Sequence, residues 1–419
     1  RPTLDFNFAA EKKLDPRITY SRSGPASFTN EFGKVVLVGD NAPKFDHDPV
    51  TRESKGLLIE ESRTNQWLYS EDLVTYVTGG NLQQSTLADT TATTDPTGGT
   101  NAVKMAATAT SGAHSFYKNF TSGSNGNTHT ASVWVKAAGV DYARIYVDTV
   151  GGNMGGPGVT FSTGNTWNVS ATGSATQAAT SVVEYPNGWW RLSVSGSFSD
   201  KNEYYVHIDL EGGEGDVSFT GNGTNGMYVW GVQFEASVFP TSYMPTNGST
   251  ATRGADCLFM DGQEFKDFYN VVESSVVMQY SHYASLTNIG GSTRPFKIFA
   301  STGSDTRIDY VSTYNFHPYI AADGSAVVGA GGLDAGTPLY DGQTNKIAVK
   351  VKHQDFASTI NGGTVATNTS GSWPPTNRMD LLTLGTLNKD GDGALNGHIQ
   401  RFTYYPMGLT NNQLVTLTS

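Results

Sequence analysis

The chain has 419 residues, a formal net charge of −11, one cysteine and only 16% charged residues. Binding to a nucleic-acid backbone needs clustered Lys and Arg, and no such cluster occurs, so the acidic balance excludes a nucleic-acid partner. The single Cys257 excludes an internal disulfide framework, and no apolar run approaches the ~18 residues that membrane insertion requires.

The composition favours β-sheet over helix. The chain holds 48 Gly, and aromatic residues reach 11%; aromatic and β-branched side chains suit a pleated surface. The length indicates two or three domains. We therefore expect an all-β protein with two antiparallel β-sandwich (jelly-roll) domains in tandem and a short N-terminal β arm.

The arm opens with Leu4, Phe6 and Phe8 in alternation with polar residues, which predicts a short strand with one apolar face. It then contains the only charge-dense run of the chain, residues 44–72, which we call the clasp. We expect four apolar clasp residues to be buried and to staple the arm onto the following domain, with Arg63 fixing the path through an ion pair or hydrogen bond. These four residues are Leu57, Leu58, Ile59 and Trp67.

Within the clasp, Asp46, His47 and Asp48 form an acidic triplet around a histidine. Adjacent residues of an extended chain point to opposite sides, so at most two of the three could share a metal ion. A turn closed by Asp hydrogen bonds is the favoured interpretation.

Four motifs of this region, in this order, carry a resemblance to a known family: RPTLDFNFAA, LDPRITYSRS, APKFDHDP and GLLIEESRTNQWLYSEDL. Together they are similar to a recurrent N-terminal module of tailed-bacteriophage structural proteins. Those proteins continue into a carbohydrate-binding-module-like jelly roll and often end in a laminin-G/concanavalin-like sandwich. The resemblance implies an arm and clasp over residues 1–75, the jelly roll over 76–250 and the terminal sandwich over 257–419.

The same resemblance implies a setting and a task. We expect a non-enzymatic virion structural protein on the exterior of a phage tail or capsid, such as a tail fibre, that binds host surface glycans. Its partners would be other virion proteins and copies of itself, with a homotrimer favoured. The alternatives are a capsid or tail decoration or connector protein without glycan binding and, as a third reading, a polysaccharide depolymerase.

Three predicted strands of the jelly roll, ASVWVKA, DYARIYVD and EYYVHIDL, each alternate between a core face and a polar, aromatic face. The core faces hold Ala131, Val133, Val135, Ala143, Ile145, Val147, Tyr204, Val206, Ile208 and Leu210. The opposite faces supply the candidate glycan-binding residues Trp134, Tyr142, Arg144, Tyr146, Asp148, Tyr205, His207 and Asp209.

This combination suits a sugar, because an aromatic ring covers the C–H face of a pyranose while Arg, Asp and His bond its hydroxyls. The open alternative is that another sheet, the clasp or a neighbouring subunit covers these residues.

The loop NKDGDGALNG places oxygen ligands at Asn388, Asp390 and Asp392, as in part of a calcium loop. The distal Glu of an EF-hand is missing, so a Gly-rich hairpin turn is the alternative. No other cofactor is indicated. The chain has no GxSxG elbow, HExxH or phosphate loop, and we expect no enzymatic activity.

Overall fold

The computed structural model describes residues 1–77, 81–283, 293–311, 317–328, 332–336 and 342–419. Within them the regular structure is nearly all β, which confirms the predicted fold class of antiparallel β-sandwich domains. The helices are short: α1 (Phe8–Glu11), α2 (Leu73–Tyr76), α3 (Gly262–Phe268) and α4 (Asn411–Thr418). None of the described helices is long and apolar enough to cross a membrane.

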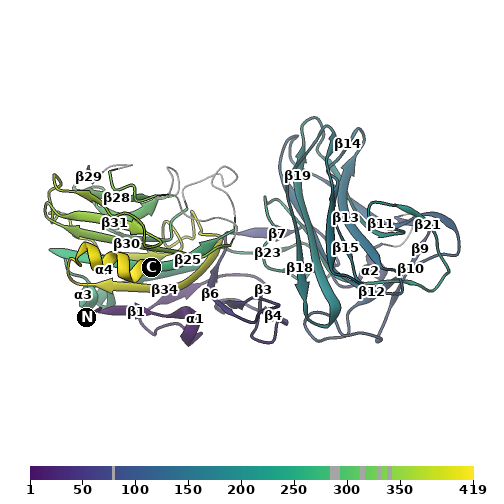
Figure 1. Cartoon of the computed structure of the whole chain (residues 1–419), viewed down its shortest axis with the longest axis horizontal. Helices are drawn as coiled ribbons and strands as arrows, with labels where there is room; N and C mark the ends of the chain where they lie inside the picture. The colour runs from purple at the N-terminus through teal and green to yellow at the C-terminus, as the bar shows by residue number, and fades with distance from the viewer. Residues whose placement is uncertain (78–80, 284–292, 312–316, 329–331, 337–341) are drawn as a thin grey trace.

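The middle of the chain folds as a jelly roll of two packed sheets (Figure 1). The six-stranded sheet has the order β18 (Ala175–Tyr185), β19 (Trp189–Phe198), β12 (His129–Ala138), β22 (Gly226–Glu235), β10 (Val103–Ala107), β9 (Ser85–Asp89). The main path of the nine-stranded sheet is β16 (Asn165–Val169), β15 (Gly156–Thr160), β13 (Tyr142–Thr149), β20 (Glu203–Glu211), β11 (Ser111–Thr121), β21 (Ser218–Thr220). Three two-residue strands extend it: β8 (Leu82–Gln83), β14 (Gly152–Asn153) and β17 (Thr172–Gly173).

The core of the jelly roll lies between these sheets and contains the alternate residues that the sequence predicted. Ala131, Val133 and Val135 of β12 face those of β13 and β20 across the layer. All ten predicted core residues of the three strands are at most 1% exposed. The period-2 alternation therefore assigned the faces of these strands correctly.

The second sandwich is built mostly from the last third of the chain. Its eight-stranded sheet contains β32 (Ala366–Asn368), β31 (Phe356–Ile360), β30 (Asn345–Lys352), β25 (Glu273–His282), β34 (Gly397–Tyr405), β6 (Ser54–Ile59) and β5 (Phe45–His47), with β1 (Leu4–Phe6) also on β34. Its seven-stranded sheet contains β2 (Thr19–Ser21), β24 (Cys257–Asp261), β33 (Leu381–Leu384), β26 (Phe296–Phe299), β27 (Arg307–Val311), β28 (His317–Ala322) and β29 (Ser325–Val328). We call this unit the C-terminal sandwich.

The strand order corrects our expectation that the arm packs on the jelly roll. Four arm strands, β1, β2, β5 and β6, belong to the C-terminal sandwich, with Leu4 opposite Tyr404 and Leu57 opposite Ile399. The apolar side chains of the arm enter the core of that sandwich because its sheets leave open edges beside β34 and β24. The arm is thus part of a domain whose strands come from both ends of the chain.

The clasp residues are buried as predicted, but in two different cores. Leu57 and Ile59 lie in the core of the C-terminal sandwich, whereas Trp67 lies in the core of the jelly roll. Between them the chain crosses from one domain to the other in β7 (Arg63–Asn65), and it returns in β23 (Ala251–Arg253), which pairs with β7 (Figure 1). The hairpin of β3 (Ala26–Thr29) and β4 (Val35–Val38) lies beside this crossing.

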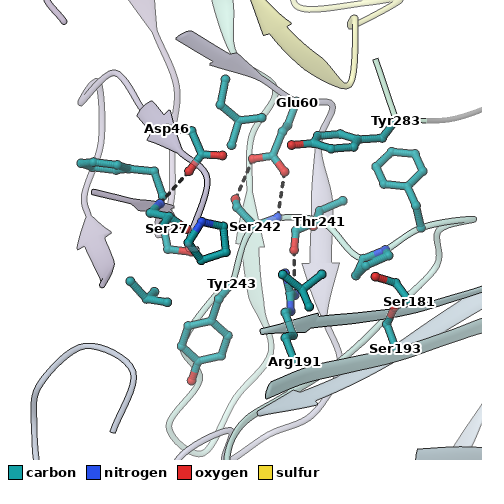
Figure 2. A pocket seen from close by; sticks show the side chains of 18 of the residues that line it. Ser27, Asp46, Glu60, Ser181, Arg191, Ser193, Thr241, Ser242, Tyr243 and Tyr283 are labelled. Atoms are coloured by element: carbon teal, nitrogen blue, oxygen red, sulfur yellow. Dashed lines mark hydrogen bonds between the residues drawn. The ribbon is translucent and has the colours of Figure 1, made fainter. Parts of the chain in front are cut away.

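A buried charge network joins the two crossing segments. Glu60 accepts hydrogen bonds from the backbone N–H (2.8 Å) and hydroxyl (2.6 Å) of Ser242 (Figure 2). It also accepts one from Lys44, and Arg253 lies 3.4 Å away. Burial alone would raise the pKa of Glu60, but the charges of Arg253 and Lys44 lower it well below its usual range. Asp256 lies 3.0 Å from Lys44 and accepts from the backbone N–H of Glu60 at 2.7 Å.

Arg63 plays a smaller part than we expected. It does form the predicted ion pair, with Glu61, but about a quarter of each side chain is exposed and both belong to the clasp itself. Fully buried Arg253 instead reaches from β23 to the Glu61 carbonyl at 2.8 Å. The path of the arm is therefore held by Lys44, Glu60, Asp256 and Arg253.

Candidate functional site

The outer face of the nine-stranded sheet gathers most of the predicted glycan-binding residues. In antiparallel strands, residues directly opposite each other project on the same face. The register of β13 and β20 places Arg144 opposite Asp209, Tyr146 opposite His207, and Asp148 opposite Tyr205. These three pairs of polar or aromatic residues therefore lie side by side on one face, which we call the stripe.

The centre of the stripe is a stack of three rings. His207 lies between Tyr146, at 4.4 Å between ring centroids and 9° between planes, and Tyr117, at 4.9 Å and 20°. Tyr117 comes from β11, where it is opposite His207. All three side chains are half-buried. Because the rings line up across three strands, their exposed edges form a continuous aromatic ridge.

The ridge ends in a charged cluster. The Arg144 guanidinium lies 4.5 Å from the Tyr146 ring centroid and pairs with Glu211 at 2.8 Å and Asp209 at 3.8 Å. At the other end Asp148 lies 3.2 Å from His207 Nε2. A ligand on the ridge would therefore meet both acidic groups and a guanidinium.

The acids beside Arg144 hold their protons more tightly than usual. Burial raises the pKa of Glu211 to about 7, and the charge of Arg144 opposes this effect only in part. Burial also raises the pKa of Asp209 well above its usual range. The contact with Arg144 at 2.8 Å lowers the pKa of Glu211, but the desolvation of the buried carboxyl group raises it by more.

Several polar atoms of the stripe lack a hydrogen-bond partner although they are buried. Among the described residues they are His207 Nδ1, Asp209 Oδ1 and Trp167 Nε1. Buried polar atoms are normally satisfied, so three such atoms on one face favour a site that receives hydrogen bonds from a ligand or water.

Sequence reasoning missed three residues of the stripe: Tyr117, Trp167 and Glu211. Tyr117 lies in SGAHSFYKNF, whose alternation would have identified it as a fourth strand with a polar, aromatic face. Trp167 is opposite Gly158, which is in turn opposite Arg144, and its indole lies directly over Gly158 because glycine has no Cβ. No local pattern connects Trp167 with Arg144.

Trp134 is the predicted residue that lies elsewhere. It projects from the outer face of the six-stranded sheet, 1% exposed, with Trp230 at 5.2 Å and Tyr243 at 5.5 Å between ring centroids. Its assignment to the non-core face was right, but it belongs to the other sheet, and the segment that returns to the C-terminal sandwich covers it. Tyr142 and Tyr205 are half-buried on the nine-stranded sheet, with Tyr205 6.2 Å from Tyr117.

The predicted calcium loop closes on itself. The Asn388 side-chain oxygen accepts from the backbone N–H groups of Asp390 (3.0 Å) and Asp392 (3.2 Å), and its amide donates to Asp392 at 2.9 Å. These hydrogen bonds are those of a Gly-rich turn and engage the Asn388 amide and one Asp392 oxygen, so calcium binding by Asn388, Asp390 and Asp392 stays a prediction. Across the described ranges, no group of three or more His, Cys, Asp or Glu is placed to hold a metal ion.

The clasp triplet also forms no shared centre. Asp46 accepts from the Thr29 N–H at 2.7 Å and lies 2.8 Å from His398 Nε2, whereas Asp48 accepts from the N–H groups of Val50 and Thr51 in a turn. The turn interpretation is therefore right for Asp48, and Asp46 instead joins the arm to β34.

No protein-family model matches the chain, and no curated protein matches it in sequence. Among solved structures it is similar to the CBM40 of the Ruminococcus gnavus IT-sialidase, with 14% identity and a TM-score of 0.29 over 36% of this chain and 84% of that one. It is also similar to domain 4 of AbnA, a GH43 extracellular arabinanase from Geobacillus stearothermophilus. The identity is 17% and the TM-score 0.30, over 39% of this chain and 73% of that one.

The NanB sialidase from Streptococcus pneumoniae gives 15% identity and a TM-score of 0.29, over 38% of this chain and 26% of that one. The chain thus spans about a quarter of that sialidase. At such low identities and TM-scores, these similarities carry no weight for what this chain binds.

Proposed function

We propose that the chain is a non-enzymatic glycan-binding protein whose ligand lies on the stripe. The observation that carries the proposal is the stack of Tyr117, His207 and Tyr146 with Arg144 at its end. The exposed edges of the stacked rings give an apolar surface for the C–H groups of a sugar, while the charged groups and unpartnered polar atoms beside them bond its hydroxyls.

The setting that we propose is the exterior of a phage particle, as a tail fibre or similar adhesion protein. It rests on the resemblance of the N-terminal motifs to tailed-bacteriophage structural proteins. Display in several copies, as a homotrimer, would make weak individual sugar sites adequate, because linked sites raise the effective concentration of the second binding event.

The test is a glycan array with the full-length protein, followed by titration of the strongest hit. Tyr146→Ala and Tyr117→Ala should each weaken binding about tenfold, because stacking together with lost ring burial is worth about 1.5 kcal/mol. Tyr228→Ala is the matched control, since Tyr228 is a half-buried aromatic residue on β22 of the other sheet.

Two outcomes would overturn the proposal. If no glycan binds, while the protein saturates particles that lack it, a decoration or connector role is correct. If the two stripe variants bind as tightly as the wild type, the ligand lies elsewhere. Release of reducing ends from a host polysaccharide would instead support a depolymerase.

A further inference from the structure

A cavity of about 420 Å³ lies between the two domains, on the side of the jelly roll opposite to the stripe. One wall is the outer face of β18 and β19; the other consists of the arm strands β3 and β5 and Tyr283 (Figure 2). Its volume falls in the range of small-molecule sites. The glycan stripe lies on the other sheet, and of the clasp network only Glu60 lines this space, beside Asp46.

The jelly-roll wall offers hydroxyl groups and a cation. Ser181 and Ser193 are opposite each other on β18 and β19, and their side chains form no hydrogen bond within the described part of the chain. Arg191 lies on the same face, with its guanidinium 4.3 Å from the Trp134 ring centroid. Its Nη2 donates to the Thr241 carbonyl at 2.9 Å and to the Ser132 hydroxyl at 3.1 Å.

Arg191 is half-buried and differs from the fully buried cations of the junction. Lys44 and Arg253 each have a carboxylate within ion-pair distance, whereas Arg191 has none among the described residues, and its Nε is buried there without a hydrogen-bond partner. Glu235 and Glu60 act on the Arg191 guanidinium only from beyond that distance. An anion in the cavity would contact the guanidinium directly, and a guanidinium suits a carboxylate in particular.

The arm wall offers a hydrogen-bond acceptor. His47 is 2% exposed, and its Nδ1 lies 3.1 Å from the Thr29 carbonyl oxygen. A carbonyl oxygen can only accept, so Nδ1 carries the proton and Nε2 of the neutral ring is an acceptor. Among the described residues Nε2 has no hydrogen-bond partner, so it is available to a ligand hydroxyl.

We propose that this cavity is a second binding site, specific for a small sugar acid such as a uronic acid unit. The carboxylate pairs with Arg191, while the ring hydroxyls bond to Ser181, Ser193 and His47. Because both domains form the walls, an occupied site joins the C-terminal sandwich to the jelly roll.

The experiment is calorimetric titration of the full-length protein with D-glucuronate and, separately, with methyl glucoside, which lacks the carboxylate. Glucuronate should bind saturably and at least tenfold more tightly than the glucoside. Arg191→Met should weaken glucuronate binding at least tenfold. Ser181→Phe fills the cavity from an edge strand and should abolish binding.

The controls separate this site from the stripe and from misfolding. Thr176→Phe introduces the same ring at an exposed position of β18 outside the cavity, and it should bind glucuronate as the wild type does. Tyr146→Ala should also leave binding unchanged. The proposal is wrong if the wild type binds no glucuronate, binds the glucoside equally, retains binding in Ser181→Phe, or loses it in Tyr146→Ala.

Discussion

At the scale of single residues, the charge of the stripe depends on the burial of its acidic side chains. Asp209 and Glu211 share one guanidinium, and both are almost fully buried. Desolvation disfavours the charged form of a carboxyl group, so the protonated form is favoured in the folded chain compared with the unfolded one. The ionisation of Glu211 is thereby coupled to stability near neutral pH.

The raised pKa of Glu211 predicts that the free energy of unfolding decreases as the pH rises. The pKa of Glu211 is raised from 4.5 to about 7, so its stabilising contribution is complete below pH 4.5 and is lost as the pH rises through 7. Glu211→Gln cannot ionise. The free energy of unfolding of the wild type, minus that of the variant, should therefore be lower at pH 8 than at pH 5 by about 2 kcal/mol.

Urea unfolding of both proteins at the two pH values measures this difference. Asp209 is present in both proteins, so its own titration cancels to first order. A difference that stays constant with pH would mean that Glu211 is ionised throughout.

The residue scale also shows what alternation alone could predict. The pattern of DYARIYVD correctly placed Tyr146 and Arg144 on the other face of the strand from Ile145, because a strand has period 2 whatever surrounds it. The same rule put Trp134 on a non-core face, but it carries no information about which sheet a strand joins. Trp167 was missed because its place over Gly158 depends on pairing between strands.

At the scale of elements, the clasp is the connection between two cores. Lys44 contacts both Glu60 and Asp256, and none of the three side chains is more than 5% exposed. Removing one partner from a buried ion pair leaves a charge without compensation. A pair that water reaches in part, such as Arg63 and Glu61, contributes less.

We therefore predict that Lys44→Met lowers the free energy of unfolding by about 3 kcal/mol, whereas Arg63→Ala lowers it by at most about 1 kcal/mol. Chemical denaturation followed by tryptophan fluorescence compares the two variants. Equal losses would show that Arg63 fixes the arm after all.

The sequence predicted that the clasp is buried, but not what buries it. An apolar run such as Leu57, Leu58 and Ile59 indicates burial in any core. The partner strand β34 lies about 340 residues further on, and no periodicity connects segments at that separation. The same holds for the pairing of Lys44 with Asp256.

At the scale of the whole molecule, the jelly roll is inserted into the C-terminal sandwich rather than preceding it. The chain enters the jelly roll at β7 and leaves it at β23, and these strands pair, with Arg63 opposite Arg253. The two crossing points are therefore neighbours. The jelly roll has its own core, whereas residues 257–419 lack four strands of theirs.

This arrangement predicts the behaviour of fragments. Residues 63–253 should fold alone and unfold cooperatively. Residues 257–419 should aggregate or remain unfolded, because β34 and β24 lose their arm partners. Joining residues 1–62 to 254–419 through a short Gly linker should restore folding, as measured by circular dichroism and thermal melting. A stable 257–419 fragment would contradict the prediction.

The pairing of β1 with β34 also sets an order of events during synthesis. Leu4 leaves the ribosome about 400 residues before its partner Tyr404, so the arm strands wait unpaired while the jelly roll is made and folds. Once folded, the jelly roll holds Asn65 opposite Ala251, which removes nearly half of the intervening chain from the loop that β1 and β34 must close. Since halving a loop lowers its closure entropy by only about 0.6 kcal/mol, the inserted domain affects the final stability little. It determines timing instead: β1 is synthesised long before β34 and can pair with it only after the jelly roll has been made.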